Sequence, residues 1–94
     1  MPYIYNVSYD LRRPGQSYQN LYRELKQSPV WWHYLDSTWL IATGESADVL
    51  WERLQPHVDA NDFILIAEIT ANYSGWLPEE AWAWIRRVQV YDHD

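Results

Sequence analysis

Along residues 3–70 the spacing of hydrophobic residues changes from strand-like to helical and back again, and it does so twice. This pattern limits the folds that the chain can adopt. Apolar residues at alternate positions are typical of a strand, whereas apolar residues at i, i+3, i+4 and i+7 are typical of a helix. The predicted elements are a strand over 3–10, a helix over 15–28, two strands within 30–43, a helix over 44–58 and a strand over 63–70. This β-α-β-β-α-β order predicts an α+β, ferredoxin-like antiparallel sheet that carries both helices on one face and leaves the other face open.

Residues at the ends of these segments favour the same boundaries. Ser17 is a suitable N-cap for the first helix, and Pro29 opposes its continuation. Ser46 is a suitable N-cap for the second helix, and Asp48 brings a negative charge into its first turn, where the helix dipole stabilises it. The last strand, FILIAEIT, is almost continuously apolar, which predicts that it is buried.

The whole chain, residues 1–94, is expected to form one domain, because domains of about 100 residues are common. Residues 70–94 are predicted to extend the sheet domain with a short helix, for which Pro78 and Glu79 are typical N-terminal residues. The final segment, VQVYDHD, is expected to be either an added strand or a loose tail.

Aromatic residues are abundant, with 7 Trp and 8 Tyr in the chain. Because each aromatic side chain can bury ~150–250 Å², one small core does not readily hide all of them, and we expect some to form a homodimer interface. The two runs within 30–43 are apolar on both faces, as in a central hairpin that packs on helices with one face and on a second protomer with the other. The candidate binding residues of this aromatic set are Trp31, Trp32, Tyr34, Trp39 and Trp76.

The formal net charge of -6 argues against a general nucleic-acid or anionic-membrane binder, because phosphate contacts need clustered Lys and Arg. The charge is uneven, and Arg12 and Arg13 are expected to form either a local basic patch for binding or a solvated turn. An alternative role for the aromatic set is a stacking platform for single-stranded nucleic acid, but its surroundings lack the positive charge that such platforms carry.

Three features that the sequence lacks limit the chemistry and the location that we expect. The chain has no cysteine, which excludes disulfides, thiolate zinc sites and cysteine nucleophiles. It has no apolar run of ~20 residues and no basic segment followed by an apolar leader. We therefore expect a cytoplasmic protein that does not contact membranes and that needs no cofactor, unless it uses Mg²⁺.

Asp10 is the candidate residue for Mg²⁺ binding and catalysis, because it ends the first predicted strand. A carboxylate in this position can hold Mg²⁺ together with water and phosphate oxygens, and a two-fold dimer can bring two such carboxylates close together. The structural alternative is that Asp10 caps the following turn or pairs with Arg12 or Arg13.

Five segments carry a resemblance that covers nearly the whole chain: VSYDL, PGQSYQNLY, WWHYLDSTWLIAT, ANDFILIAEI and GWLPEEAWAWI. They resemble a family of small bacterial proteins labelled SinR-like; no helix-turn-helix is predicted, so the transcriptional regulator of that name is not implied. More distantly, the element order and Asp10 resemble the small subunit of the CRISPR spacer-acquisition complex, a ferredoxin-like homodimer that includes metal-dependent nucleases. The acidic charge and the extra final helix depart from that second family.

The aromatic residues, together with these resemblances, lead to two expected functions of different classes. The first is a homodimeric interaction module linked to bacterial defence or mobile elements. The second is a Mg²⁺-dependent nuclease centred on Asp10.

Overall fold

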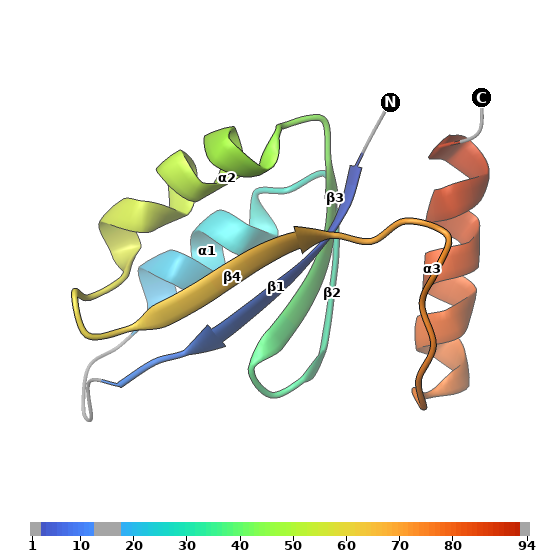
Figure 1. The fold of residues 1–94 in the computed structure, drawn as a ribbon, viewed down its shortest axis with the longest axis horizontal. Helices are drawn as coiled ribbons and strands as arrows, with labels where there is room; N and C mark the ends of the chain where they lie inside the picture. Colours follow the sequence, from blue (N-terminus) through green and yellow to red (C-terminus); the bar gives the residue numbers. More distant parts are fainter. Residues whose placement is uncertain (1–2, 13–17, 93–94) are drawn as a thin grey trace.

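The computed structural model describes residues 3–12 and 18–92, with the side chains of Tyr34 and of residues 89–92 outside the description. Its elements are β1 (Tyr3–Asp10), α1 (Gln19–Lys26), β2 (Val30–Leu35), β3 (Thr38–Thr43), α2 (Ala47–Leu54), the 3₁₀ helix η1 (Gln55–His57), β4 (Phe63–Glu68) and α3 (Glu79–Asp92). Within these residues, a four-stranded antiparallel sheet and three α-helices confirm the predicted α+β class (Figure 1). Arg13 and Ser17 lie outside the described residues.

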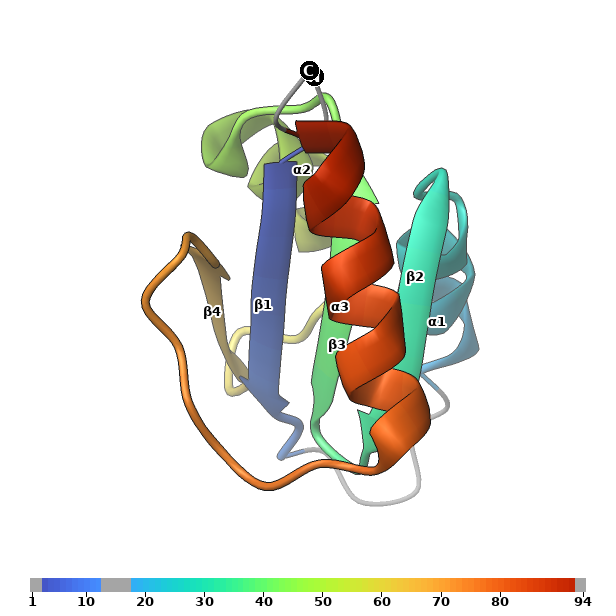
Figure 2. The same ribbon diagram turned by 90° about the vertical axis from the view of Figure 1, so that its right-hand side faces the viewer.

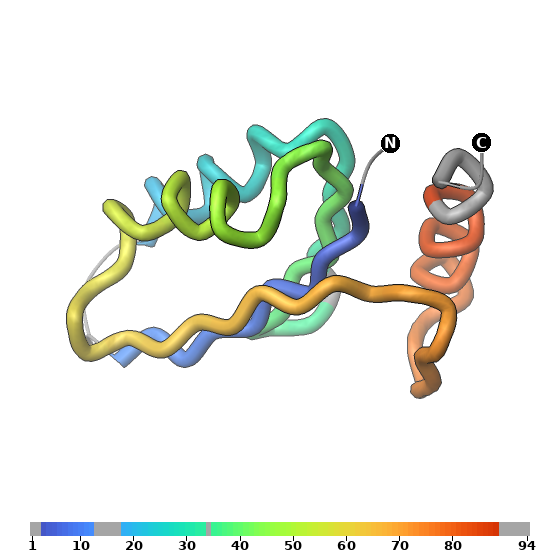
Figure 3. Tube along the Cα trace, turned by 45° about the horizontal axis from the view of Figure 1, so that its top comes forward, coloured from blue at the N-terminus to red at the C-terminus, as the bar shows by residue number. Residues whose placement is uncertain are grey.

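The strands follow the order β2-β3-β1-β4, and every neighbouring pair is antiparallel. β1 and β2 therefore run parallel to one another on either side of β3, and α1 connects them. In the same way, β3 and β4 flank β1 and are connected through α2. Both connecting helices lie on one face of the sheet (Figure 1, Figure 3).

The main hydrophobic core lies between this face of the sheet and helices α1 and α2. Alternate residues of β1 point into it, because successive side chains of a strand face opposite sides. Its buried members are Tyr5, Val7, Tyr9, Tyr18, Leu21, Leu25, Trp39, Ile41, Leu50 and Leu54. Trp39 is only 1% exposed, which confirms its predicted position inside a central strand.

Helix α3 lies against the opposite face of the sheet, so the prediction that this face is open is wrong. Figure 2 shows α3 passing over β3, between β1 and β2. A second core forms there from Ile4, Trp32, Leu40, Ala42, Ala81, Trp84, Ile85 and Val88. The four residues from α3 recur at i, i+3, i+4 and i+7, which gives the helix an apolar stripe that matches the second apolar face of the hairpin.

The C-terminal helix is also longer than predicted. α3 has 14 residues and runs to Asp92, where the sequence predicts a short helix followed by a strand or a loose tail. The Pro78 carbonyl oxygen accepts a hydrogen bond of 2.9 Å from the backbone N–H of Ala81 and so begins the first turn. None of the helices in the described residues has the length and apolar character needed to cross a bilayer.

The N-terminus of α2 follows the prediction, whereas that of α1 differs. The Ser46 side-chain oxygen accepts a hydrogen bond of 3.2 Å from the backbone N–H of Val49, and Asp48 lies in the first turn. Helix α1 begins only at Gln19, and its N-cap residue, Tyr18, makes no side-chain capping bond.

β4 is an edge strand, so the prediction that this apolar segment is buried is wrong for one of its faces. Phe63 is 63% exposed and Leu65 is 65% exposed, while Ile64 and Ile66 pack partly buried against the main core. Among the described residues, the strand pairs only with β1, and α3 does not extend over it (Figure 2). An apolar run indicates that both faces are hydrophobic, but it does not indicate that both faces are covered.

Candidate functional site

Trp39 lies among aromatic rings that come from α1 and β2. The His33 ring stacks on it with centroids 4.0 Å apart and planes at 10°, and the Tyr22 ring stacks at 6.1 Å. The Trp31 ring is tilted at 5.4 Å from Trp39, and Lys26 Nζ lies 5.4 Å from the centroid of Trp31. Because ring pairs at such spacings each add ~0.5–1.5 kcal/mol beyond their burial, this cluster fixes α1 against the β2–β3 hairpin.

The five predicted aromatic binding residues do not form one surface. Trp39 and Trp32 are buried in different cores on opposite faces of the sheet. Trp31 is 41% exposed on β2, and Trp76 is 97% exposed in the segment between β4 and α3. The Tyr34 side chain lies outside the described residues. In the described part of the chain, the aromatic set therefore divides into two core residues and two separate exposed residues.

The Tyr9 hydroxyl lies inside the main core, beside Trp39. Burial raises the pKa of Tyr9 to about 12, and the hydrogen bond from Trp39 opposes this shift only in part. Tyr9 therefore keeps its proton at neutral pH and serves as a neutral hydrogen-bond acceptor. This is the position of a structural residue, because the hydroxyl is enclosed rather than open to a substrate.

Asp10 and Arg12 form an exposed ion pair at the end of β1. Arg12 Nη2 lies 2.8 Å and Nε 2.9 Å from Asp10 Oδ2, and both side chains are more than half exposed. The Arg12 backbone N–H also donates a hydrogen bond of 2.7 Å to Asp62 Oδ1, which holds the turn after β1 in place. An ion pair with Arg12 is one of the structural alternatives that the sequence analysis gives for Asp10. The other possible partner, Arg13, lies outside the described residues.

The described part of the chain contains no group of three or more His, Asp or Glu side chains arranged to hold a metal ion. The carboxylate of Asp10 is next to the Arg12 guanidinium instead. A Mg²⁺ site at Asp10 requires several further oxygen ligands. The Mg²⁺ hypothesis therefore depends on ligands from a second copy of the chain, from water or from a substrate.

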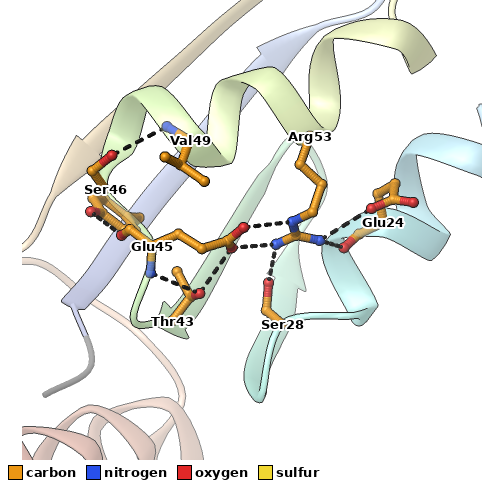
Figure 4. Close-up of polar contacts among 8 residues, drawn as sticks. Glu24, Ser28, Thr43, Glu45, Ser46, Val49 and Arg53 are labelled. Atoms are coloured by element: carbon orange, nitrogen blue, oxygen red, sulfur yellow. Dashed lines mark hydrogen bonds and ion pairs between the residues drawn. The ribbon is translucent and has the colours of Figure 1, made fainter.

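Arg53 of α2 is the centre of a polar network that sequence reasoning missed (Figure 4). Its Nε and Nη2 atoms donate hydrogen bonds of 3.1 and 3.0 Å to the two carboxylate oxygens of Glu45. Its Nη2 also donates to Ser28 Oγ at 3.1 Å, and its Nη1 donates to the backbone carbonyl oxygen of Glu24. Thr43 Oγ1 donates to Glu45 Oε1 at 2.9 Å. The network therefore ties α2 to the end of α1 and to the end of β3.

The protonation of Glu45 follows from this network. Burial raises the pKa of Glu45, but hydrogen bonds from Arg53 and Thr43, together with the positive charge of Arg53, outweigh burial and lower the pKa. Glu45 is therefore ionised at neutral pH and pairs with Arg53. Because the side chains of Glu45 and Arg53 are 28% and 21% exposed, this pair is less screened by water than the Asp10–Arg12 pair.

The outer edge of β4 is a regular strand edge with no neighbouring strand in the described sheet. Its pairing with β1 runs over the whole strand without a register shift. Just beyond β4, the Ile69 backbone N–H donates a hydrogen bond of 2.8 Å to the Ile4 carbonyl oxygen. Because inward and outward backbone groups alternate in an antiparallel ladder, the N–H groups of Ile64 and Ile66 point away from β1.

Over residues 63–67, β4 lacks the protections that edge strands usually carry, and its charged residue, Glu68, is at its end. Residues 63–67 contain no charged residue and no proline, whereas natural sheet edges are commonly blocked by Lys, Pro or a bulge. The opposite edge of the sheet is different, because β2 has a register shift between Trp32 and Leu35 that interrupts its ladder. Of the two sheet edges, β4 is therefore the better template for another strand.

Comparison of this chain with known protein families, with curated proteins and with solved structures gave no match in any of the three. The resemblances carried by the sequence segments stay predictions.

Proposed function

We propose that this protein is a homodimeric interaction module in which the β4 strands of two copies pair edge to edge. The observation that carries the proposal is the regular edge of β4, which is uncharged over residues 63–67 and ends at Glu68, and on which Phe63 and Leu65 are 63% and 65% exposed. Antiparallel pairing of β4 with a second β4 fits two-fold symmetry, because one and the same strand then faces itself in the reverse direction. It also supplies hydrogen-bond partners to the outward N–H and C=O groups of both strands.

The distribution of charge supports the choice of β4 for self-association. Each chain carries a formal net charge of -6, so two copies repel one another at long range. Residues 63–67 themselves add no charge to this repulsion, and the nearest acidic residues are Asp62 and Glu68 at the two ends of the segment. At one end of the strand the guanidinium carbon of Arg12 lies 5.1 Å from the centroid of the Phe63 ring, and the charge of Arg12 is balanced by its ion pair with Asp10. Burial of Phe63 and Leu65 then supplies the attraction, at roughly 25 cal/mol per Å² of apolar surface.

We also infer that the fold is ferredoxin-like, a particular fold within the α+β class. Support comes from the two interleaved β-α-β units, each with a third strand between its two strands and its helix on the same face of the sheet. The resemblance to SinR-like proteins and, more distantly, to the CRISPR spacer-acquisition small subunit adds the proposal that the module serves bacterial defence or mobile elements.

Light scattering on wild-type protein and on two edge variants tests the dimer. Wild-type protein is expected to have about twice the monomer mass of 11.3 kDa. Leu65→Lys brings like charges together at the pairing edge, so this variant is expected to be monomeric at the same concentration. Leu35→Lys is the matched control, because Leu35 is a 43% exposed leucine on the opposite edge, and it is expected to stay dimeric. A monomeric wild type, or dissociation by Leu35→Lys and not by Leu65→Lys, contradicts pairing through β4.

A further inference from the structure

A pocket of about 260 Å³ lies on the second face of the sheet, between α3 and the segment that leads from β4 to α3. It is separate from the edge of β4 and from the Asp10–Arg12 pair. Its walls come from three strands, from the connecting segment and from α3, and they include Asn6, Trp32, Leu40, Tyr73, Trp76 and Trp82.

Aromatic rings form much of this wall. The rings of Tyr73 and Trp82 are stacked, with centroids 6.4 Å apart and planes at 15°. Trp32 is buried in the second core, whereas Trp76 is 97% exposed although it lines the same pocket. Flat apolar walls favour a flat apolar ligand, because stacked rings combine dispersion with the loss of water-exposed surface.

Asn6 supplies a polar group to the pocket. Its Oδ1 atom accepts a hydrogen bond of 2.6 Å from Ser8 Oγ. Among the described residues, none accepts a hydrogen bond from the Asn6 amide nitrogen. An amide group has two N–H donors, so Asn6 can donate to a ligand that brings an acceptor. A few polar groups, such as Asn6 and Ser74, in a mainly apolar wall are the usual composition of a small-molecule site.

We propose that this pocket binds a small, neutral aromatic molecule of two fused rings whose edge carries a hydrogen-bond acceptor, to which Asn6 Nδ2 donates. The size follows from the volume, because an apolar cavity of about 150 Å³ takes up one benzene ring and this pocket measures about 260 Å³. The neutrality follows from charge, because no charged side chain of the described residues lines the pocket and the chain as a whole is acidic. Trp76 covers the bound ring and thereby loses part of its exposed surface.

Quinoline is the probe that tests this site, because it has two fused rings and one acceptor nitrogen and is neutral at pH 7. It is titrated into ¹⁵N-labelled full-length protein while the indole N–H signals and the Asn6 side-chain amide signals are followed by NMR. The signals of Trp76, Trp82 and Asn6 are expected to shift together and to saturate at one quinoline per chain. The signal of Trp51, which lies on α2 across the sheet, is the internal control and is expected to stay in place.

Two variants separate the ring contact from the hydrogen bond. Asn6→Ala is expected to weaken quinoline binding about 3- to 10-fold, the range of one neutral hydrogen bond, and to leave the binding of naphthalene, which has no acceptor, unchanged. Trp76→Ala is expected to weaken both ligands, whereas Trp31→Ala on β2 changes neither. The proposal is overturned if quinoline causes no saturating shift, if Trp51 shifts equally, or if Asn6→Ala weakens both ligands alike. It is also overturned if dilution alone moves the Trp76 signal, because a second copy then fills the pocket.

Discussion

The indole Nε1 of Trp39 donates a hydrogen bond of 3.0 Å to the hydroxyl oxygen of Tyr9, and both atoms are buried in the main core. The bond joins neighbouring strands β3 and β1 on the face that packs against α1 and α2. A buried N–H group that loses its acceptor costs more than the bond itself contributes, because the group no longer has water to bond with. The central pair of strands is therefore sensitive to a single hydroxyl group.

Tyr9→Phe is expected to lower the free energy of unfolding by about 1–3 kcal/mol, because it removes the acceptor and leaves the Trp39 N–H buried without a partner. Urea unfolding of both proteins measures the difference. Tyr3→Phe is the matched control, because Tyr3 lies on the same strand but is 42% exposed, and it is expected to change stability little. Equal effects of the two substitutions would show that the buried bond is not worth more than an exposed hydroxyl.

Truncation of tryptophan is expected to separate the core from the surface. Trp39→Ala removes a side chain that is 1% exposed, and it is expected to cost about 3–5 kcal/mol of stability. Trp76→Ala removes one that is 97% exposed and is expected to stay within about 0.5 kcal/mol of the wild type. The denaturant midpoints of the two variants are compared with that of the wild type. A Trp39→Ala midpoint close to the wild-type value would show that Trp39 is not a core residue.

The pairing of Glu45 with Arg53 predicts a loss of stability in acid. Because folding lowers the pKa of Glu45 from 4.5, the contribution of this carboxylate is fully present above about pH 4.5 and is lost as the pH falls through the lower value of the folded protein. Glu45→Gln removes the titrating group, so its stability is expected to fall less steeply below about pH 4.5 than that of the wild type. Glu52→Gln, on the exposed side of α2, is the control variant. Parallel curves for wild type and Glu45→Gln, measured by urea unfolding across this range, would speak against the network.

Asp10→Asn separates the ion pair from the nuclease hypothesis. The pair with Arg12 is more than half exposed, so its loss is expected to cost only about 0–1 kcal/mol. No Mg²⁺-dependent cleavage of single- or double-stranded nucleic acid is expected from the wild type or the variant. Cleavage by highly purified wild-type protein that disappears with EDTA and in Asp10→Asn would favour the nuclease over the interaction module.

The alternation within β1 and the helical spacing after it predict the main core, because local spacing determines which side chains share a face. Tyr5, Val7 and Tyr9 alternate and are buried together as predicted. Ser46 was likewise identifiable as a cap, because capping depends on its own side chain and the next turn. These features depend on residues close in sequence.

The coverage of the second face could not be predicted in the same way. The apolar side chains of Trp32 and Leu40 show that this face needs a partner, but a second copy and a later helix satisfy that need equally well. The apolar stripe of α3 shows that this helix is the partner, but only once the position of α3 on the sheet is known. The exposure of Leu65 has a similar cause, because strand order decides which apolar strand is at the edge.

The Arg53 network was missed for a different reason. Arg53 looks like an exposed charge on a helix, and its partners Glu24 and Glu45 belong to other parts of the chain. Their distances become visible only when α1, α2 and β3 are assembled (Figure 4). The sequence offers charged residues of the right types, but it offers no local spacing that pairs them.

Amide hydrogen exchange at Ile64 and Ile66, measured over a range of protein concentrations, tests pairing through β4 most directly. These two N–H groups point away from β1, so they are open to water in a monomer and hydrogen-bonded when a second β4 is present. Self-pairing predicts that their protection rises with concentration and disappears in Leu65→Lys, while the amide of Ile41 in the interior strand β3 stays protected throughout. Fast exchange at Ile64 and Ile66 that is unchanged at every concentration would contradict the proposed dimer.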